Sequence, residues 1–214
     1  MQMVIGTRKW STWSMRPWLV ARRAGVEVED IVVPLRTHET SKALEPYAPS
    51  SQAPVLIDGE LKVWDSLAIC EYLADRLPGK ALWPKDPAAR AVARSACAQM
   101  HGGFQSLRGE CPMDLAAPID TLELTEATQN DVRKVVRLWR ALKQGHGQGR
   151  TGEDGPFLMG QWSIVDAYFT PVATRFRTYN VDLSDHGDDG PAAAWCALAL
   201  QQPEYLEWER LALA

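Results

Sequence analysis

The dipeptide Asp58-Gly59 restricts the fold of this chain most strongly, because an apolar run lies on each side of it. Asp-Gly between two such runs is a strong local signal for a β-hairpin, since both residues tolerate the backbone conformation of a tight turn. We therefore predict two antiparallel strands within residues 53–64, joined at Asp58-Gly59.

Other short elements surround this hairpin. Met3–Gly6 is a four-residue apolar stretch typical of a buried strand, and we expect a helix after it that carries Trp18–Ala24 and has Ser14 as its N-cap. We predict a second strand within residues 26–34, a short helix around residues 42–44, and a helix over residues 65–77 that ends at Pro78-Gly79. Residues 1–80 are therefore expected to form one α/β domain.

The remainder of the chain has helical patterns only. Asp86-Pro87 is a typical helix start, and helical composition continues to about Arg108. Ser163 and Asp166 have the spacing of a capping box that opens a further helix. The other expected helices cover residues 124–142, 191–200 and 203–211, and the Gly/His/Gln-rich tract over residues 144–155 is expected to be a loop. Residues 86–214 are therefore predicted to form an all-helical domain.

Charge and cysteine content exclude several classes of function. The net charge is −4 and there is no Lys/Arg cluster, which argues against nucleic-acid binding. No apolar stretch approaches the roughly 18 residues of a membrane span, and no signal peptide is evident. The four cysteines are widely spaced without metal-ligand spacing, so we expect free thiols, no metal site and a cytoplasmic location.

The segment between the first strand and the first helix is rich in hydroxyl groups. Ser11, Thr12 and Ser14 lie where free backbone N–H groups and the positive end of a helix dipole favour an anion. On this segment alone, helix capping is the commoner use of such residues. Binding of a thiolate or another small anion is the alternative.

Four motifs in order resemble those of the cytosolic glutathione transferases, over nearly the whole chain. The Ser-Thr-Trp-Ser-Met-Arg turn, ending at Arg16, is similar to that of serine-type, zeta-like bacterial members. Residues 53–56 resemble the family's cis-proline segment, Asp65-Ser66 its Glu/Gln-Ser pair, and residues 160–166 the capping box of its central helix. The resemblance implies a thioredoxin-like N-terminal domain followed by a helical bundle.

The resemblance also implies a glutathione site. Ser11 would activate the thiol by hydrogen bonding to the thiolate, with Thr12 and Ser14 as alternatives. A cis bond between Ala53 and Pro54 would present the Ala53 backbone to the cysteinyl unit. Asp65 and Ser66 would cap a helix and bind the ammonium and carboxylate groups of the γ-glutamyl unit. Three residues are candidates for the glycyl carboxylate: His38, Lys42 and Gln52.

The second substrate is expected against the helical domain, near Gly102-Gly103. This glycine pair is costly inside a helix and indicates either close approach of a ligand or a kink between core side chains. The proposed lining residues of this site are Trp13, His101, Phe104 and Arg108. Arg175 and Arg177 could bind an anionic substrate, although a solvated helix face is the simpler interpretation, and Cys111 fits a buried apolar residue as well as a reactive thiol.

Three functions follow from the resemblance. The first is glutathione transfer to a small electrophile, with glutathione as co-substrate and a homodimer as the expected assembly. The second is a glutathione-dependent cis–trans isomerase similar to maleylacetoacetate isomerase, although Trp13 stands where the zeta-type turn has cysteine. The third is a non-catalytic binding or scaffold protein, because a fold does not determine a function.

Overall fold

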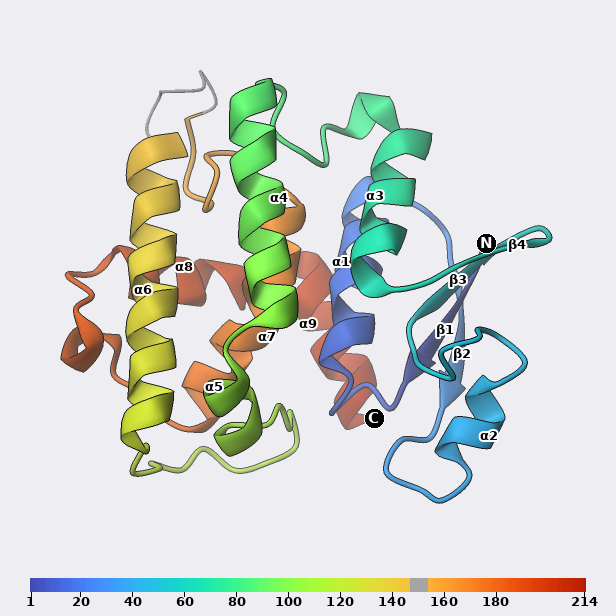
Figure 1. The fold of residues 1–214 in the computed structure, drawn as a ribbon, viewed down its shortest axis with the longest axis horizontal. Helices are drawn as coiled ribbons and strands as arrows, with labels where there is room; N and C mark the ends of the chain where they lie inside the picture. The colour runs from blue at the N-terminus through green and yellow to red at the C-terminus, as the bar shows by residue number, and fades with distance from the viewer. Residues whose placement is uncertain (147–153) are drawn as a thin grey trace.

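The computed structural model describes residues 1–146 and 154–214. Figure 1 shows a small sheet on one side of the molecule and a group of helices on the other. The strand order is β2-β1-β3-β4, with β1 parallel to β2 and antiparallel to β3. The strands are β1 (Gln2–Gly6), β2 (Glu29–Val33), β3 (Val55–Asp58) and β4 (Leu61–Val63).

The predicted hairpin is confirmed. β3 and β4 are antiparallel, and Asp58 is paired with Leu61 across the turn. Gly59 has a φ of 62°, a conformation that glycine adopts at little cost. The β-α-β unit and the short helix before the hairpin are also found where the sequence predicts them.

Helix α1 (Thr12–Ala24) connects β1 to its parallel neighbour β2, and α2 (Thr40–Leu44) precedes the hairpin. α1 packs against α3 (Ser66–Arg76) on one side and against α7 (Ile164–Thr178) on the other. Its side chains Met15 and Trp18 are both fully buried, and the ring of Trp18 lies 5.2 Å from that of Trp208 in the C-terminal helix. α1 is therefore the element through which the sheet region contacts the helical region.

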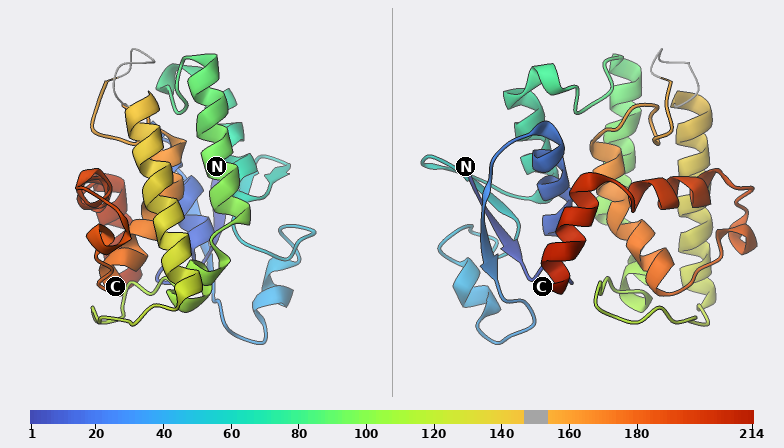
Figure 2. Two further views of the ribbon diagram at one scale, coloured as in Figure 1. Left: turned by 60° about the vertical axis from the view of Figure 1, so that its left-hand side comes forward. Right: turned by 180° about the vertical axis from the view of Figure 1, so that it is seen from behind.

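The helical region is arranged around α7, which is buried over nearly its whole length. α4 and α8 pack directly on α7, and the ring of Trp139 from α6 lies 5.6 Å from the ring of Phe169; Figure 2 shows this grouping from two further sides. The remaining helices are α4 (Pro87–Gly102), α5 (Gln105–Glu110), α6 (Glu126–His146), α8 (Pro191–Ala199) and α9 (Pro203–Leu213), with short 3-10 turns at Pro78–Lys80 and Leu183–His186.

The capping box at the start of α7 is confirmed. The Ser163 N–H donates to the Asp166 carboxylate at 2.9 Å. The same buried carboxylate accepts from the Leu158 N–H at 3.1 Å and from Trp195 Nε1 at 2.8 Å. Burial outweighs these hydrogen bonds and raises the pKa of Asp166 to about 6.

One predicted helix is broken into two. α4 ends at Gly102 and α5 begins at Gln105, whereas the sequence pattern continues to Arg108. Phe104 adopts a φ of 56° at the break and is buried. A Cβ atom on Gly103 would lie 2.6 Å from the carbonyl oxygen of Gln99, so only glycine fits there without a shift. The kink interpretation of the glycine pair is therefore correct.

A second difference concerns the Gly/His/Gln-rich tract. α6 continues to His146, so the first residues of the tract, from Gln144, are helical rather than a loop. Residues 147–153, which include most of the predicted loop, lie outside the described part of the chain. No helix of the described residues is long and apolar enough to cross a membrane.

Candidate active site

A cleft of about 390 Å³ lies between the sheet region and the helices α4 and α5. Ligand sites of small molecules are typically clefts of this size, with a few converging polar groups. A larger hollow of about 500 Å³ lies along α6 and the turn at Gly187, but it contains none of the predicted site residues. The cleft is lined by Trp13, Ser50, Gln52, Ala53, Pro54, Trp64, Asp65, Ser66, His101, Gln105 and Arg108.

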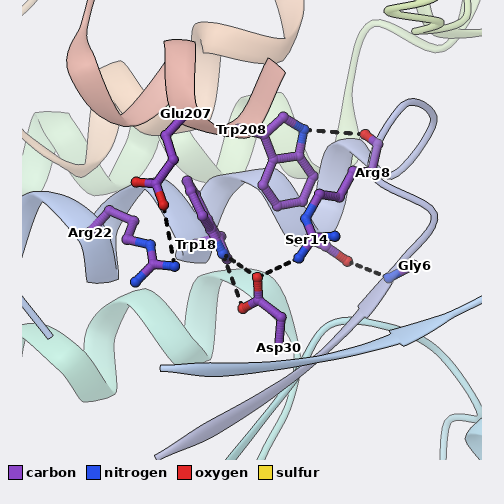
Figure 3. A network of polar contacts seen from close by, with 8 residues as sticks. All are labelled: Gly6, Arg8, Ser14, Trp18, Arg22, Asp30, Glu207 and Trp208. Carbon is purple, nitrogen blue, oxygen red and sulfur yellow. Dashed lines mark hydrogen bonds and ion pairs between the residues drawn. The ribbon is translucent and has the colours of Figure 1, made fainter. Parts of the chain in front are cut away.

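The turn between β1 and α1 is held by contacts to distant parts of the chain. Figure 3 shows this network. Arg8 forms an ion pair with Asp30 of β2 at 2.6 Å, and the Arg8 carbonyl accepts from Trp208 Nε1 of α9 at 3.2 Å. Trp18 Nε1 donates to the same Asp30 carboxylate at 3.0 Å. The start of α1 is therefore fixed relative to β2 and α9.

Ser14 is not the N-cap that the sequence analysis expects. The N-cap position is occupied by Ser11, three residues earlier, and α1 begins at Thr12. The Ser14 side chain is fully buried inside the first turn, where its oxygen accepts from the Gly6 N–H at 3.1 Å and from the Ser11 hydroxyl at 2.7 Å. Ser14 therefore stabilises the turn from within and does not face the cleft.

The other two hydroxyl candidates, Ser11 and Thr12, are not among the residues that line the cleft. Ser11 is 6% exposed and Thr12 is 9% exposed, and both occupy the start of α1 beside Trp13. Trp13 itself lines the cleft. The backbone at this helix start carries the free N–H groups that favour an anion.

Trp13 is held by three cationic or polar side chains. The guanidinium groups of Arg16 and Arg108 lie 4.0 Å and 4.9 Å from its ring centroid. The ring of His101 lies 4.9 Å away at a tilt of 40°. These contacts fix Trp13 as one wall of the cleft, since a cation over an indole face is an attractive arrangement.

Arg16 lies behind this wall and is buried. Its Nε donates to the Tyr168 carbonyl at 3.0 Å, while its Nη1 has no hydrogen-bond partner in the described part of the chain. Burial lowers the pKa of Arg16 to about 9. Arg16 therefore adds a buried positive charge next to the start of α1, without a carboxylate to neutralise it among the described residues.

The proline segment has the predicted conformation, because the Ala53–Pro54 peptide bond is cis. β3 begins its pairing with β1 only at Val55, so Ala53 precedes the paired region and lies on the cleft. Gln52 lines the cleft beside it. The position of these two residues agrees with the predicted binding of an extended ligand.

Asp65 and Ser66 lie at the start of α3 and line the cleft, and the predicted capping of this helix by Asp65 is confirmed. Asp65 is the N-cap, with its carboxylate accepting from the Leu67 N–H at 3.0 Å, and it also lies 3.1 Å from Nε2 of His101. The Ser66 hydroxyl lies 2.9 Å from the hydroxyl of Tyr168. Both residues therefore already contact the helical region.

Three further residues of the predicted site do not line the cleft. The His38 side chain is 90% exposed and pairs with Glu39. Lys42 belongs to α2 and is exposed, and Phe104 is buried at the kink. Phe104 is thus a core residue, because its left-handed backbone conformation turns the chain between α4 and α5.

The sequence analysis missed three residues that line the cleft, Ser50, Trp64 and Gln105, and also the buried Tyr168, whose hydroxyl contacts Ser66. Trp64 is next to Asp65 and is 43% exposed, which is unusual for a large apolar side chain in a strand-rich region. Gln105 follows the glycine pair directly. Tyr168 has no sequence signal that distinguishes it from a core tyrosine of α7.

Arginine side chains form a positive region beside the cleft. Arg108 lines the cleft, and burial lowers its pKa. Arg175 is buried rather than on a solvated face, and burial together with the nearby Arg108 charge lowers its pKa to about 10. Within the described residues, neither of these two forms an ion pair, whereas Arg177 pairs with Glu209 at 2.6 Å.

The cysteines do not supply a nucleophile. Cys70, Cys97 and Cys111 are fully buried free thiols, and Cys196 is a half-buried free thiol whose pKa is also raised by burial. Burial raises the pKa of Cys111 to about 11 and that of Cys97 well above its usual value. Since the thiolate is the reactive form, these groups act as small apolar residues.

Comparisons with known proteins agree with this geometry. Residues 10–76 match the family described as glutathione S-transferase, N-terminal domain. A probable maleylacetoacetate isomerase from Caenorhabditis elegans is 29% identical over 177 residues, which is 82% of this chain and 78% of that protein.

Two solved structures illustrate the likeness in fold. A glutathione transferase homologue from Burkholderia, with bound glutathione, has a TM-score of 0.72 at 21% identity and covers 99% of this chain and 97% of its own. A bacterial maleyl pyruvate isomerase of the zeta class has a TM-score of 0.71 at 20% identity, and the alignment covers 99% of this chain and 98% of that protein.

A thioredoxin-like α/β region followed by a helical region, with a cleft between them, defines the glutathione transferase fold. Residues 10–76 match the N-terminal domain family of the glutathione S-transferases. The chain as a whole has the glutathione transferase fold and is similar to a probable maleylacetoacetate isomerase in sequence and to a zeta-class isomerase in structure.

Proposed function

We propose that this protein is a glutathione-dependent transferase, which activates the thiol of glutathione for attack on a small electrophile. The observation that carries the proposal is the cleft itself. It combines Ala53 and the cis proline, the start of α3 at Asp65-Ser66, and a wall formed by Trp13 of α1. We propose residues 1–80 as the glutathione-binding domain and residues 86–214 as the domain that contributes the electrophile site.

The backbone of Ala53 would pair with the cysteinyl unit of glutathione, as an added strand pairs with a sheet edge. Asp65 would accept a hydrogen bond from the α-ammonium group, and the N–H and hydroxyl of Ser66 would donate to the α-carboxylate. Gln52 is the proposed donor to the glycyl carboxylate, because it lines the cleft beside Ala53. In this arrangement each charged end of glutathione meets a complementary group.

Ser11 is the proposed donor to the thiolate. The Ser11 hydroxyl donates to the Ser14 oxygen at 2.7 Å, and the same oxygen accepts from the Gly6 N–H. Because a hydroxyl rotates about its C–O bond, the Ser11 hydrogen would turn from Ser14 to the sulfur when glutathione binds. The helix start and the buried charge of Arg16 favour the same anion.

A second function is favoured by the arginine side chains beside the cleft. Arg108 and Arg175 carry positive charges that no carboxylate of the described residues pairs with. An anionic acceptor would neutralise them, and the relatives named as maleylacetoacetate and maleyl pyruvate isomerases are named for anionic substrates. In such an isomerase the thiolate adds to a double bond, rotation follows, and the same C–S bond breaks.

Retention on immobilised glutathione separates these functions from a scaffold role, because a protein that passes through unbound does not hold glutathione. Conjugation of glutathione to a chloronitrobenzene would support the transferase. Turnover of maleylacetone would support the isomerase, and its absence would count against it. We also propose a homodimer, as is usual for this fold, which light scattering tests.

A further inference from the structure

Asp65, His101, Tyr168 and Ser66 form a continuous series of polar contacts at the cleft wall, which we call the hydrogen-bond chain. Asp65 Oδ2 lies 3.1 Å from His101 Nε2, His101 Nδ1 lies 3.4 Å from the Tyr168 hydroxyl, and that hydroxyl lies 2.9 Å from the Ser66 hydroxyl. The chain starts and ends on neighbouring residues at the start of α3. It passes through α4 and α7, so it joins the sheet region to the helical region.

The donors and acceptors in this chain fit a neutral His101 in one direction only. Nε2–H donates to Asp65, so Nδ1 must accept from the Tyr168 hydroxyl. Burial raises the pKa of Tyr168, which therefore keeps its single hydrogen. With that hydrogen used toward His101, the Tyr168 oxygen accepts from Ser66. The Ser66 hydrogen is then used inside the protein.

Protonation of His101 reverses the donor–acceptor direction of the hydrogen bonds between His101, Tyr168 and Ser66. Nδ1 then carries a hydrogen and donates to the Tyr168 oxygen, so Tyr168 donates to Ser66. The Ser66 hydrogen is released and can be donated to an anion in the cleft. No covalent bond changes in this step, because each hydroxyl only rotates.

Charged and titratable groups face His101 from the elements packed against it. Asp65 of α3 is an anionic partner, and the side chain of His101 is 37% exposed at the cleft. Arg108 of α5 donates to the His101 carbonyl at 3.4 Å, and Arg16 of α1 lies behind Trp13. Tyr168 is the titratable group that faces His101 from α7.

We propose that Tyr168 is a positioning residue that, with His101, decides whether the Ser66 hydroxyl donates within the protein or to the α-carboxylate of the ligand. This inference rests on the proposed binding of glutathione. It makes carboxylate binding by Ser66 dependent on the charge of an imidazole that is linked to Ser66 through the Tyr168 hydroxyl. The 3.4 Å contact is the longest in the chain and limits the size of the effect.

The test uses two analogues that separate the charged groups of the γ-glutamyl unit. Glutaryl-cysteinylglycine lacks the ammonium group and therefore does not compete with His101 for Asp65. γ-Aminobutyryl-cysteinylglycine lacks the α-carboxylate. Their dissociation constants are measured by calorimetry between about pH 8 and about pH 5.5, the range in which imidazoles become charged.

For the wild type, the glutaryl analogue is expected to bind about tenfold more tightly at the lower pH, the effect of one additional hydrogen bond to a charged group. In Tyr168→Phe the Ser66 hydrogen is free at every pH, so affinity is high throughout and most of the pH dependence is lost. His101→Gln is also expected to remove the pH dependence of binding. Tyr179→Phe is the matched control, because it deletes a hydroxyl that donates to the Pro112 carbonyl away from the cleft.

Two further results are required. The γ-aminobutyryl analogue must show no effect of Tyr168→Phe, and in a Ser66→Ala background Tyr168→Phe must change nothing more. An unchanged pH dependence in Tyr168→Phe would mean that His101 acts only through its charge, and it overturns this proposal alone. Failure of the wild type to bind glutathione or either analogue overturns the proposed function as well.

Discussion

Adjacent glycines at the end of α4 are expected to respond in opposite directions to the same substitution. Gly102 is the last residue of the helix, and a Cβ atom there would meet nothing within 4 Å. A Cβ atom on Gly103 would lie 2.6 Å from the Gln99 carbonyl oxygen, a backbone atom that cannot rotate away. Both glycines have negative φ values, so the difference comes from contact alone.

The magnitudes follow from these surroundings. Gly102→Ala lowers the backbone entropy of the unfolded chain and is expected to stabilise the protein by up to about 1 kcal/mol. Gly103→Ala forces the end of α4 or the kink at Phe104 to move, which costs about 1 to 3 kcal/mol as in other overpacked sites. The two variants are thus expected to differ by at least about 1 kcal/mol.

Urea unfolding at neutral pH measures this difference, with the slope of each transition used to verify that both variants unfold alike. Because the kink separates His101 from Gln105 and Arg108, Gly103→Ala is also expected to weaken ligand binding in the cleft. Equal unfolding free energies for the two variants would refute the structural account of the kink.

Three other predictions concern single side chains. Ser14→Ala leaves the buried Gly6 N–H without its acceptor and is expected to cost about 1 to 3 kcal/mol in urea unfolding; a loss below about 0.5 kcal/mol would contradict the bracing role. Burial raises the folded-state pKa of Asp166 to about 6, so its contribution to stability is present at low pH and is lost as the pH rises from about 4 to about 6. The free energy of unfolding should therefore fall by at most about 3 kcal/mol over that interval. A rise that is removed by Asp166→Asn would contradict this sign. Arg108→Gln is expected to raise the KM of an anionic electrophile about tenfold and that of a neutral electrophile little, and equal changes for both would contradict an anion site.

Local sequence signals predicted the elements that depend on neighbouring residues. The Asp58-Gly59 hairpin, the Asp65 cap and the Ser163–Asp166 box are each decided by turn or capping chemistry within a few positions. The resemblance added the cis bond before Pro54, which base rates alone would not support.

The positions of other residues could not be predicted from the sequence, because they depend on contacts between distant segments. Serine is a common N-cap residue, but the Ser14 oxygen instead accepts a hydrogen bond from the Gly6 N–H at the end of β1. Arg175 is buried because α7 packs on all sides, which its own helical spacing does not reveal. Tyr168 reaches Ser66 across 102 positions, so its place at the cleft depends on how α3 and α7 pack.

The central claim is that the cleft binds glutathione and stabilises its thiolate at the start of α1. The most direct measurement is a titration of the bound thiol, followed by the ultraviolet absorbance of the thiolate, in the wild type and in Ser11→Ala. We expect the pKa of bound glutathione to lie well below the ordinary thiol value of about 8.5, and to move back toward it in Ser11→Ala. A bound thiol that titrates like free glutathione, or a lowered value that Ser11→Ala leaves unchanged, would contradict the account.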